Sequence, residues 1–141
     1  MMNKEWEPIF QIELIDIINS LHIKKLHVGS SDSLINETMG EPELPVARLN
    51  RKSKIFNHLY GNVNILSENH TVISINIDMH GFRKKMVILG SINSWKFDDW
   101  LALSKIKDWN VNQFCDGVRL EGKGIVICLL PDGKVEMVTL S

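Results

Sequence analysis

The sequence predicts a single α+β domain in which a mainly antiparallel sheet of five to seven strands packs with three helices. Helical spacing of apolar residues recurs in three segments, residues 4–21, 32–39 and 97–108. The intervening and following segments read as short strands joined by brief polar turns, which is typical of antiparallel sheets. No repeat, linker or low-complexity segment interrupts the chain, so we expect residues 1–141 to form one domain with its own core.

The first predicted helix spans residues 4–21. Its apolar residues form two adjacent rows, so the apolar stripe is wide and should pack closely against a sheet. Pro8 lies in the expected first turn, where a missing amide hydrogen costs nothing. A brief strand at Leu26–Val28 should follow this helix. The two rows are Ile9, Ile12, Ile17 and Leu21, and Phe10, Leu14 and Ile18.

A short capped helix is predicted over residues 32–39. Ser31 is a suitable N-cap, because its hydroxyl can accept a hydrogen bond from an unpaired amide of the first turn. Asp32 places negative charge where the helix dipole favours it. Gly40 can adopt the left-handed conformation that ends a helix, and Pro42 prevents its continuation.

Strands dominate the middle of the chain. Residues 55–60 and 63–66 are predicted to form either one bent strand interrupted by Gly61 or two strands. A turn at residues 67–70 should lead to a further strand at 73–77. In the last of them Ile73, Ile75 and Ile77 alternate with polar residues, which indicates one buried and one solvated sheet face. The preceding basic connector contains Arg48, Arg51, Lys52 and Lys54. We expect the connector to be an exposed segment or an edge strand that begins near Val46. Its cations form either a solvated loop or a basic patch for an acidic partner.

The third predicted helix, residues 97–108, follows another strand at 85–89. Asp98 and Asp99 lie in its first turn, and its apolar face is expected from Phe97, Trp100, Leu101, Leu103 and Ile106. Residues 109–117 show no periodicity and are expected to be irregular. The chain should end in strands at 118–120, 124–130 and 134–140, the last two forming a hairpin around Pro131-Asp132-Gly133.

Composition narrows the choice of partner and compartment. The formal net charge is −1, from 16 Lys and Arg against 17 Asp and Glu, so the basic excess of a nucleic-acid-binding protein is missing. The longest apolar run is far shorter than the roughly 20 residues that span a bilayer, and the first residues lack the features of a signal peptide. Free Cys115 and Cys128, the latter expected to be buried, suit a reducing compartment. We therefore expect a cytoplasmic protein with no membrane or nucleic-acid partner.

The sequence contains no recognisable catalytic, cofactor or metal motif. Its five histidines show no helical i, i+4 pair, and no serine lies in a Gly-x-Ser-x-Gly turn. We therefore expect a non-catalytic protein, and the oligomeric state stays open. The alternative is a small enzyme or ligand-binding domain with a pocket between sheet and helices, suggested by the histidines and the polar strand face of Ser74, Asn76 and Asp78.

A longer pattern extends from the second predicted helix into the middle strands. It comprises Leu26, Val28, Gly29, Ser31, Ile35, Gly40 and Pro42, followed by Tyr60, Gly61, Val63 and Ile65. This pattern, over roughly a third of the chain, resembles that of bacterial immunity proteins encoded beside polymorphic toxins, including those of contact-dependent growth inhibition. The resemblance implies a stoichiometric inhibitor that binds a cognate toxin domain. It assigns no binding residue, because such interfaces vary between toxin pairs.

The segment from Trp95 to Asp116 is the surface we expect to bind the partner, in preference to the solvated sheet face and the basic connector. Aromatic anchors supply much of the energy of an interface, and nearby acids accelerate association with a basic partner. The alternative is that both indoles pack inward and the acids only cap the helix. The predicted partner-binding residues are Trp95, Asp98, Asp99, Asp108, Trp109 and Asp116.

Overall fold

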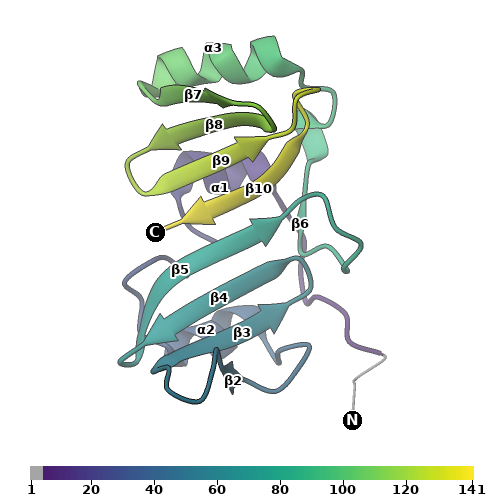
Figure 1. Cartoon of the computed structure of the whole chain (residues 1–141). Coiled ribbons are helices and arrows are strands. Elements are labelled where there is room, and N and C mark those ends of the chain that lie inside the picture. The colour runs from purple at the N-terminus through teal and green to yellow at the C-terminus, as the bar shows by residue number, and fades with distance from the viewer. Residues whose placement is uncertain (1–4) are drawn as a thin grey trace.

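The computed structural model, which describes residues 5–141, has an α+β fold built on one eight-stranded antiparallel sheet (Figure 1). The strand order is β2-β3-β4-β5-β10-β9-β8-β7. The strands are Ala47–Arg48 (β2), Ile55–Tyr60 (β3), Val63–Glu68 (β4), Thr71–Asp78 (β5), Asn110–Phe114 (β7), Gly117–Gly122 (β8), Ile125–Leu129 (β9) and Val135–Leu140 (β10).

The sheet consists of two four-stranded meanders placed side by side. Each meander ends in its innermost strand, and these two strands, β5 and β10, pair antiparallel with Ile77 opposite Val138 and Ile75 opposite Leu140. Between the meanders the chain passes through β6 (Val87–Ile88), a 3-10 turn (η1, Gly90–Ile92) and helix α3 (Phe97–Lys107). The prediction of an antiparallel sheet is confirmed, but five to seven strands was too few.

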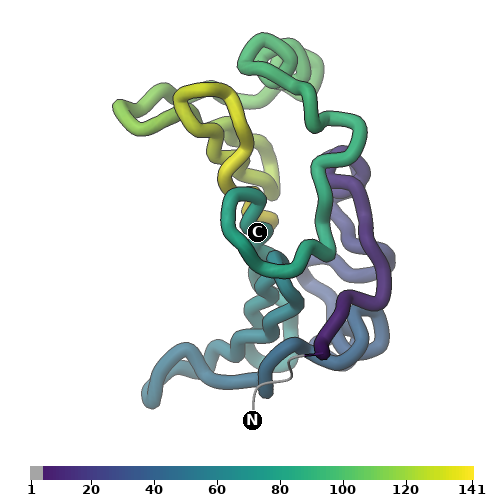
Figure 2. The backbone as a smooth tube through the Cα atoms, turned by 90° about the vertical axis from the view of Figure 1, so that its right-hand side faces the viewer, coloured from purple at the N-terminus to yellow at the C-terminus, as the bar shows by residue number. Residues whose placement is uncertain are grey.

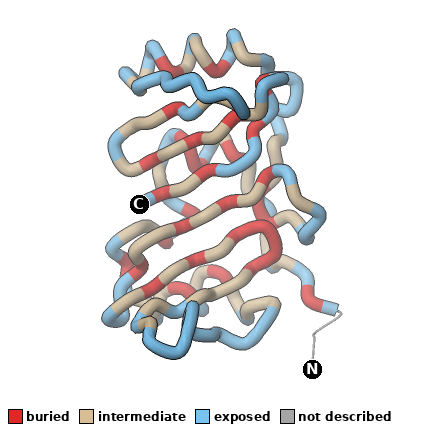
Figure 3. The backbone as a smooth tube through the Cα atoms, in the orientation of Figure 1, coloured by how far each residue is buried: buried red, intermediate tan, exposed pale blue. Residues whose placement is uncertain are grey.

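One face of the sheet carries the hydrophobic core. Helices α1 (Leu14–Ser20) and α2 (Ser33–Met39) lie on this face, behind the sheet in Figure 1. Buried residues alternate along the central strands (Figure 3), because successive strand side chains point to opposite faces. The core residues from the sheet include Val63, Ile65, Val72, Ile75, Ile77, Leu120, Ile127, Val138 and Leu140.

Within residues 5–141 no helix covers the opposite face of the sheet, which we call the open face (Figure 1). In the side view of Figure 2 the β2–β3 loop and the β7–β8 turn both project away from the helices, so the open face is concave. Strand pairing places on this face Asn57, Leu59, Asn64, Leu66, Ser74, Asn76, Val126, Cys128, Met137 and Thr139. Cys128, which we expected to be buried in the core, is therefore only half-buried.

The N-terminal segment differs most from the prediction. Residue 4 lies outside the described residues, and the helix expected over 4–21 is formed only by Leu14–Ser20. Ile12–Glu13 instead forms a short strand, β1, paired parallel with β6. The extended segment before it is held by tertiary contacts, since the buried Trp6 donates its indole N–H to the Glu41 carbonyl at 2.8 Å.

The region around α2 follows its local signals only in part, because the N-cap is Asp32 rather than the predicted Ser31 and no acid lies in the first turn. The helix begins at Ser33, whose amide donates to the Ser31 hydroxyl at 3.4 Å, and Gly40 ends it with φ of 80°. The strand expected at Leu26–Val28 is wrong, because only an isolated bridge pairs Ile23 with Leu26.

Two irregularities explain strand residues that face the unexpected side. A shift in register between β4 and β5 leaves Ile73 half-buried while its neighbour Val72 is buried. A second shift in β10 places Met137 on the open face, although Val135 before it is buried. Strict alternation therefore holds only on either side of each shift.

The third predicted helix is confirmed as α3, but its apolar face is partly wrong. Ile106 is 80% exposed, whereas Ser104 is buried and donates its hydroxyl hydrogen to the Trp100 carbonyl at 2.8 Å. The segment that we expected to be irregular contains β7, which pairs along its length with β8. Within residues 5–141 no helix is long and apolar enough to cross a membrane.

Candidate functional site

The predicted partner-binding residues lie at the β7 end of the sheet, on and beside α3. Three of them are brought together: Asp98, Asp108 and Trp109 line a groove of about 590 Å³ between α3 and β7. Leu101 and Val111 add apolar surface to the same groove. Both aspartates are exposed and the indole of Trp109 is half-buried.

Trp109 is held in the groove by its neighbours. Its backbone amide donates to the Ser104 carbonyl at 2.9 Å, which ties the residue to the last turn of α3. Its indole packs directly on Gly122 of β8, where a Cβ atom would collide with the ring. A half-buried indole on a fixed backbone is suited to anchor a partner, since little conformational freedom remains to be lost on binding.

The other three predicted residues do not line this groove. Trp95 packs against the core, edge-on to Trp100 with ring centroids 4.9 Å apart. The Asp99 carboxylate accepts the Lys96 amide hydrogen at 2.8 Å and so stabilises the start of α3. Asp116 lies in the β7–β8 turn and lines a separate depression. For Trp95 and Asp99 these contacts match the alternative, in which an indole packs inward and an acid caps the helix.

The open face presents a polar ladder across the centre of the sheet. Asn64, Asn76 and Thr139 lie opposite one another on β4, β5 and β10. The Thr139 hydroxyl donates to the Asn76 side-chain oxygen at 3.1 Å, and the Asn76 amide donates to the Ser74 hydroxyl at 3.2 Å. Among the described residues the side-chain oxygens of Asn57 and Asn64 are shielded from solvent and accept no hydrogen bond.

A basic cavity at the opposite end of the molecule was not predicted. It occupies about 600 Å³ between the β2–β3 hairpin and the start of α2. The basic connector supplies four of its nine polar lining residues. The signal in the sequence was therefore the run of cations that we interpreted as a loop or a patch. Its lining residues are Asp32, Val46, Arg48, Lys52, Ser53, Lys54, Phe56, His58, Ser67, Asn69 and His70.

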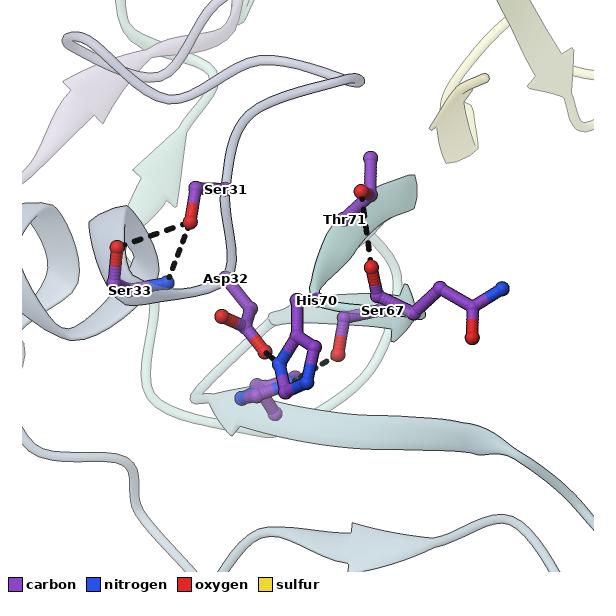
Figure 4. A network of polar contacts seen from close by, with 8 residues as sticks. Ser31, Asp32, Ser33, Ser67, His70 and Thr71 are labelled. Carbon is purple, nitrogen blue, oxygen red and sulfur yellow. Dashed lines mark hydrogen bonds and ion pairs between the residues drawn. The ribbon is translucent and has the colours of Figure 1, made fainter.

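Two histidines that line the basic cavity are fixed by hydrogen bonds, and Figure 4 labels one of them, the exposed His70, beside Asp32. His70 Nδ1 lies 3.0 Å from Asp32 Oδ2, which joins the β4–β5 turn to the start of α2. His58 Nε2 lies 2.8 Å from the Ser67 hydroxyl on the neighbouring strand. Burial lowers the pKa of His58, and the nearby Asp32 carboxylate opposes this shift. His58 is therefore uncharged at neutral pH.

The cations at the mouth of the basic cavity lack anionic partners. In the described part of the chain, Arg48, Lys52 and Lys54 form no ion pair. Counting only Lys, Arg, Asp and Glu, these cations and Asp32 give the lining a formal net charge of +2. The whole chain has a net charge of −1, so its remaining residues together carry −3. The cavity is thus a local positive site on a mildly acidic protein.

Residues 5–141 contain no group of three His, Cys, Asp or Glu side chains arranged to hold a metal ion. Comparison with protein-family models, curated proteins and solved structures finds no match for this chain. Its function is therefore inferred from the surfaces described above.

Proposed function

We propose that this chain is a non-catalytic protein-binding domain that binds and neutralises a cognate bacterial toxin domain in the cytoplasm. The observation that carries this proposal is the α3–β7 groove, where a half-buried indole, apolar side chains and exposed carboxylates meet. The Gly-x-Ser and Gly-x-Pro pattern around α2, which resembles that of immunity proteins, supports the same class of function.

The groove has the composition of an interface rather than of a catalytic site. Trp109 offers a large apolar area beside the apolar surface of Leu101 and Val111, and such central aromatic contacts dominate binding energies. Asp98 and Asp108 lie at the same groove and would attract a basic partner. Lys105 is the one cation in the groove lining.

The adjoining strand strengthens the proposal. All five residues of β7 are exposed, and β7 is the last strand of the sheet. A terminal strand has backbone N–H and C=O groups on one side that pair with no further strand, and such edges accept segments of partner proteins. A protein partner could therefore contact the groove and the strand together.

Co-expression with the product of the gene immediately upstream tests the proposal. We expect that product to be toxic alone, to be harmless together with this chain, and to co-purify with it. Trp109→Ala and Asp98→Lys should weaken the complex, whereas Glu37→Lys, on the exposed side of α2, should not. A harmless upstream product, or two proteins that do not co-purify, would contradict the proposed function.

A second candidate function is ligand binding, and the basic cavity favours it. The cavity lies between the sheet and α2, combines convergent polar groups with a histidine of lowered pKa, and has the volume of ordinary ligand sites. This candidate and the toxin-binding function use opposite ends of the molecule, so one can be lost without the other.

A further inference from the structure

We propose that the basic cavity binds a small phosphate-bearing ligand with a flat ring, of the size of a nucleoside monophosphate. The inference rests on the second candidate function, ligand binding, and is independent of toxin binding. It follows from the charge, the aromatic wall and the volume of the cavity, taken together.

The positive charge of the cavity lining favours an anionic ligand. Arg48, Lys52 and Lys54 reach the cavity from the β2–β3 hairpin, and none is neutralised by a described carboxylate. The one acid in the lining, Asp32, is already engaged by His70 at 3.0 Å. Guanidinium and ammonium groups make strong charge-assisted hydrogen bonds to phosphate oxygens. A phosphate would therefore satisfy cations that the protein leaves unpaired.

The apolar wall of the cavity favours a ligand that contains a planar ring. Phe56 is exposed and lines the cavity together with Val46, and the Arg48 guanidinium lies 6.0 Å from the Phe56 ring centroid. A planar ring can stack on an exposed phenyl group and gain energy that a bare anion cannot. Arg48 lies over one face of this ring and is close enough to contact a phosphate attached to a group stacked there.

The inner end of the cavity supplies hydrogen bonds rather than charge. Buried Ser67 and half-buried His58, which hydrogen-bond to each other at 2.8 Å, line this end, and the exposed Asn69 lines the rim. Such groups suit the hydroxyl groups or ring edge of a ligand whose phosphate remains at the mouth. The volume of about 600 Å³ exceeds what inorganic phosphate needs and lies within the range for organic ligands.

Calorimetric titration of the full chain with three probes tests this inference: adenosine 5′-monophosphate, pyrophosphate and adenosine. We expect the monophosphate to bind with a Kd of about 10⁻⁴ M or tighter, and more weakly at high salt. Pyrophosphate and adenosine should each bind at least about tenfold more weakly, because each lacks one of the two recognised parts.

Variants assign the binding to the cavity. Lys54→Gln should weaken the monophosphate about tenfold, since one charge-assisted hydrogen bond is lost. Phe56→Leu should weaken the monophosphate similarly while leaving pyrophosphate unchanged, because only stacking is removed. Lys123→Gln, an exposed lysine in the β8–β9 turn, is the matched control and should have no effect. Circular dichroism and thermal unfolding establish that each variant remains folded.

The outcomes separate the inference from the function on which it rests. Pyrophosphate must not bind as tightly as the monophosphate if the ring is recognised. Equal affinities for these two probes, both unchanged by Phe56→Leu, would contradict recognition of a ring and show that the cavity binds simple anions. If adenosine binds as tightly as the monophosphate, recognition of the phosphate is contradicted. If a single-stranded oligonucleotide binds while the monophosphate does not, the proposal that the ligand is a small molecule is contradicted. No binding of any probe would remove both the inference and the ligand-binding function.

Discussion

The side chain of Asn62 and the backbone of Val87 form hydrogen bonds in both directions. The Asn62 amide donates to the Val87 carbonyl at 2.9 Å, and the Val87 amide donates to the Asn62 side-chain oxygen at 3.1 Å. The same oxygen accepts the Met86 amide hydrogen at 2.9 Å. A buried side chain in the β3–β4 turn thus replaces a strand partner and attaches β6 to the main sheet.

Asn62→Ala should therefore destabilise the protein by about 2–4 kcal/mol, because buried backbone groups of β6 lose their partners. Urea unfolding followed by circular dichroism measures this change. Asn64→Ala is the control: Asn64 lies on the open face, and its side-chain oxygen accepts no hydrogen bond from a described residue. Its cost should stay below about 1 kcal/mol. Equal costs for both variants would contradict the assigned role of Asn62.

Trp109→Ala should weaken binding of the upstream toxin by about 2 kcal/mol or more, because it removes the central apolar area of the α3–β7 groove. Asp98→Lys should mainly slow association, since it inverts an exposed charge that forms no ion pair with another described residue. Surface plasmon resonance on the co-purified pair separates the two effects. Asp99 is unsuitable for this test because its carboxylate caps α3. Unchanged kinetics in both variants would move the interface to the open face or the basic connector.

Asp108→Asn should stabilise the isolated protein while slowing association with the toxin. Asp108 ends α3 with φ of 58°, a left-handed conformation that asparagine also tolerates. Its negative charge lies at the helix C-terminus, where the dipole disfavours it by about 0.3–1 kcal/mol. Thermal unfolding and association rates measure the two effects. A loss of stability in this variant would show that the carboxylate has a structural role.

The lowered pKa of His58 should make folding less favourable at acidic pH. Because the folded pKa lies below the unfolded value of 6.5, the unfolded chain binds more protons as the pH falls from 6.5. The contribution of neutral His58 to the free energy of unfolding is fully present above pH 6.5. It is lost progressively as the pH falls from 6.5 to the lower pKa of the folded state. His58→Gln should flatten this part of the stability curve, as measured by urea unfolding between about pH 5 and pH 8.

The elements predicted correctly are those whose signals lie close together in the chain. The polar residues before Ser33 and the stop at Gly40 bound α2 within a few residues of sequence, although its N-cap is Asp32 rather than Ser31. The turn at Pro131-Asp132-Gly133 likewise lies between β9 and β10, which pair as expected. In each case the residues that specify the element are also the residues that form it.

The elements predicted wrongly depend on distant partners. Residues 9–12 show helical spacing, yet the chain there is extended because Trp6 binds the Glu41 carbonyl and Ile12 pairs with Val87. Strand β7 lacks alternation, since all of its residues are exposed, and its strand conformation depends on β8. Periodicity reports burial on one side of an element, so it misses an element that buries neither side.

The candidate sites divide in the same way. The sequence by itself determined the α+β class, the antiparallel pairing, the helices α2 and α3, and the residue types near Trp109, because local propensity and alternation encode these features. Only the tertiary structure decided that Asp98, Asp108 and Trp109 share a groove while Trp95 packs into the core. It also gathered Asp32, Lys54 and His70 around one cavity. Those groupings arise from hydrogen bonds and packing between segments far apart in the chain, whose relative placement no local pattern records.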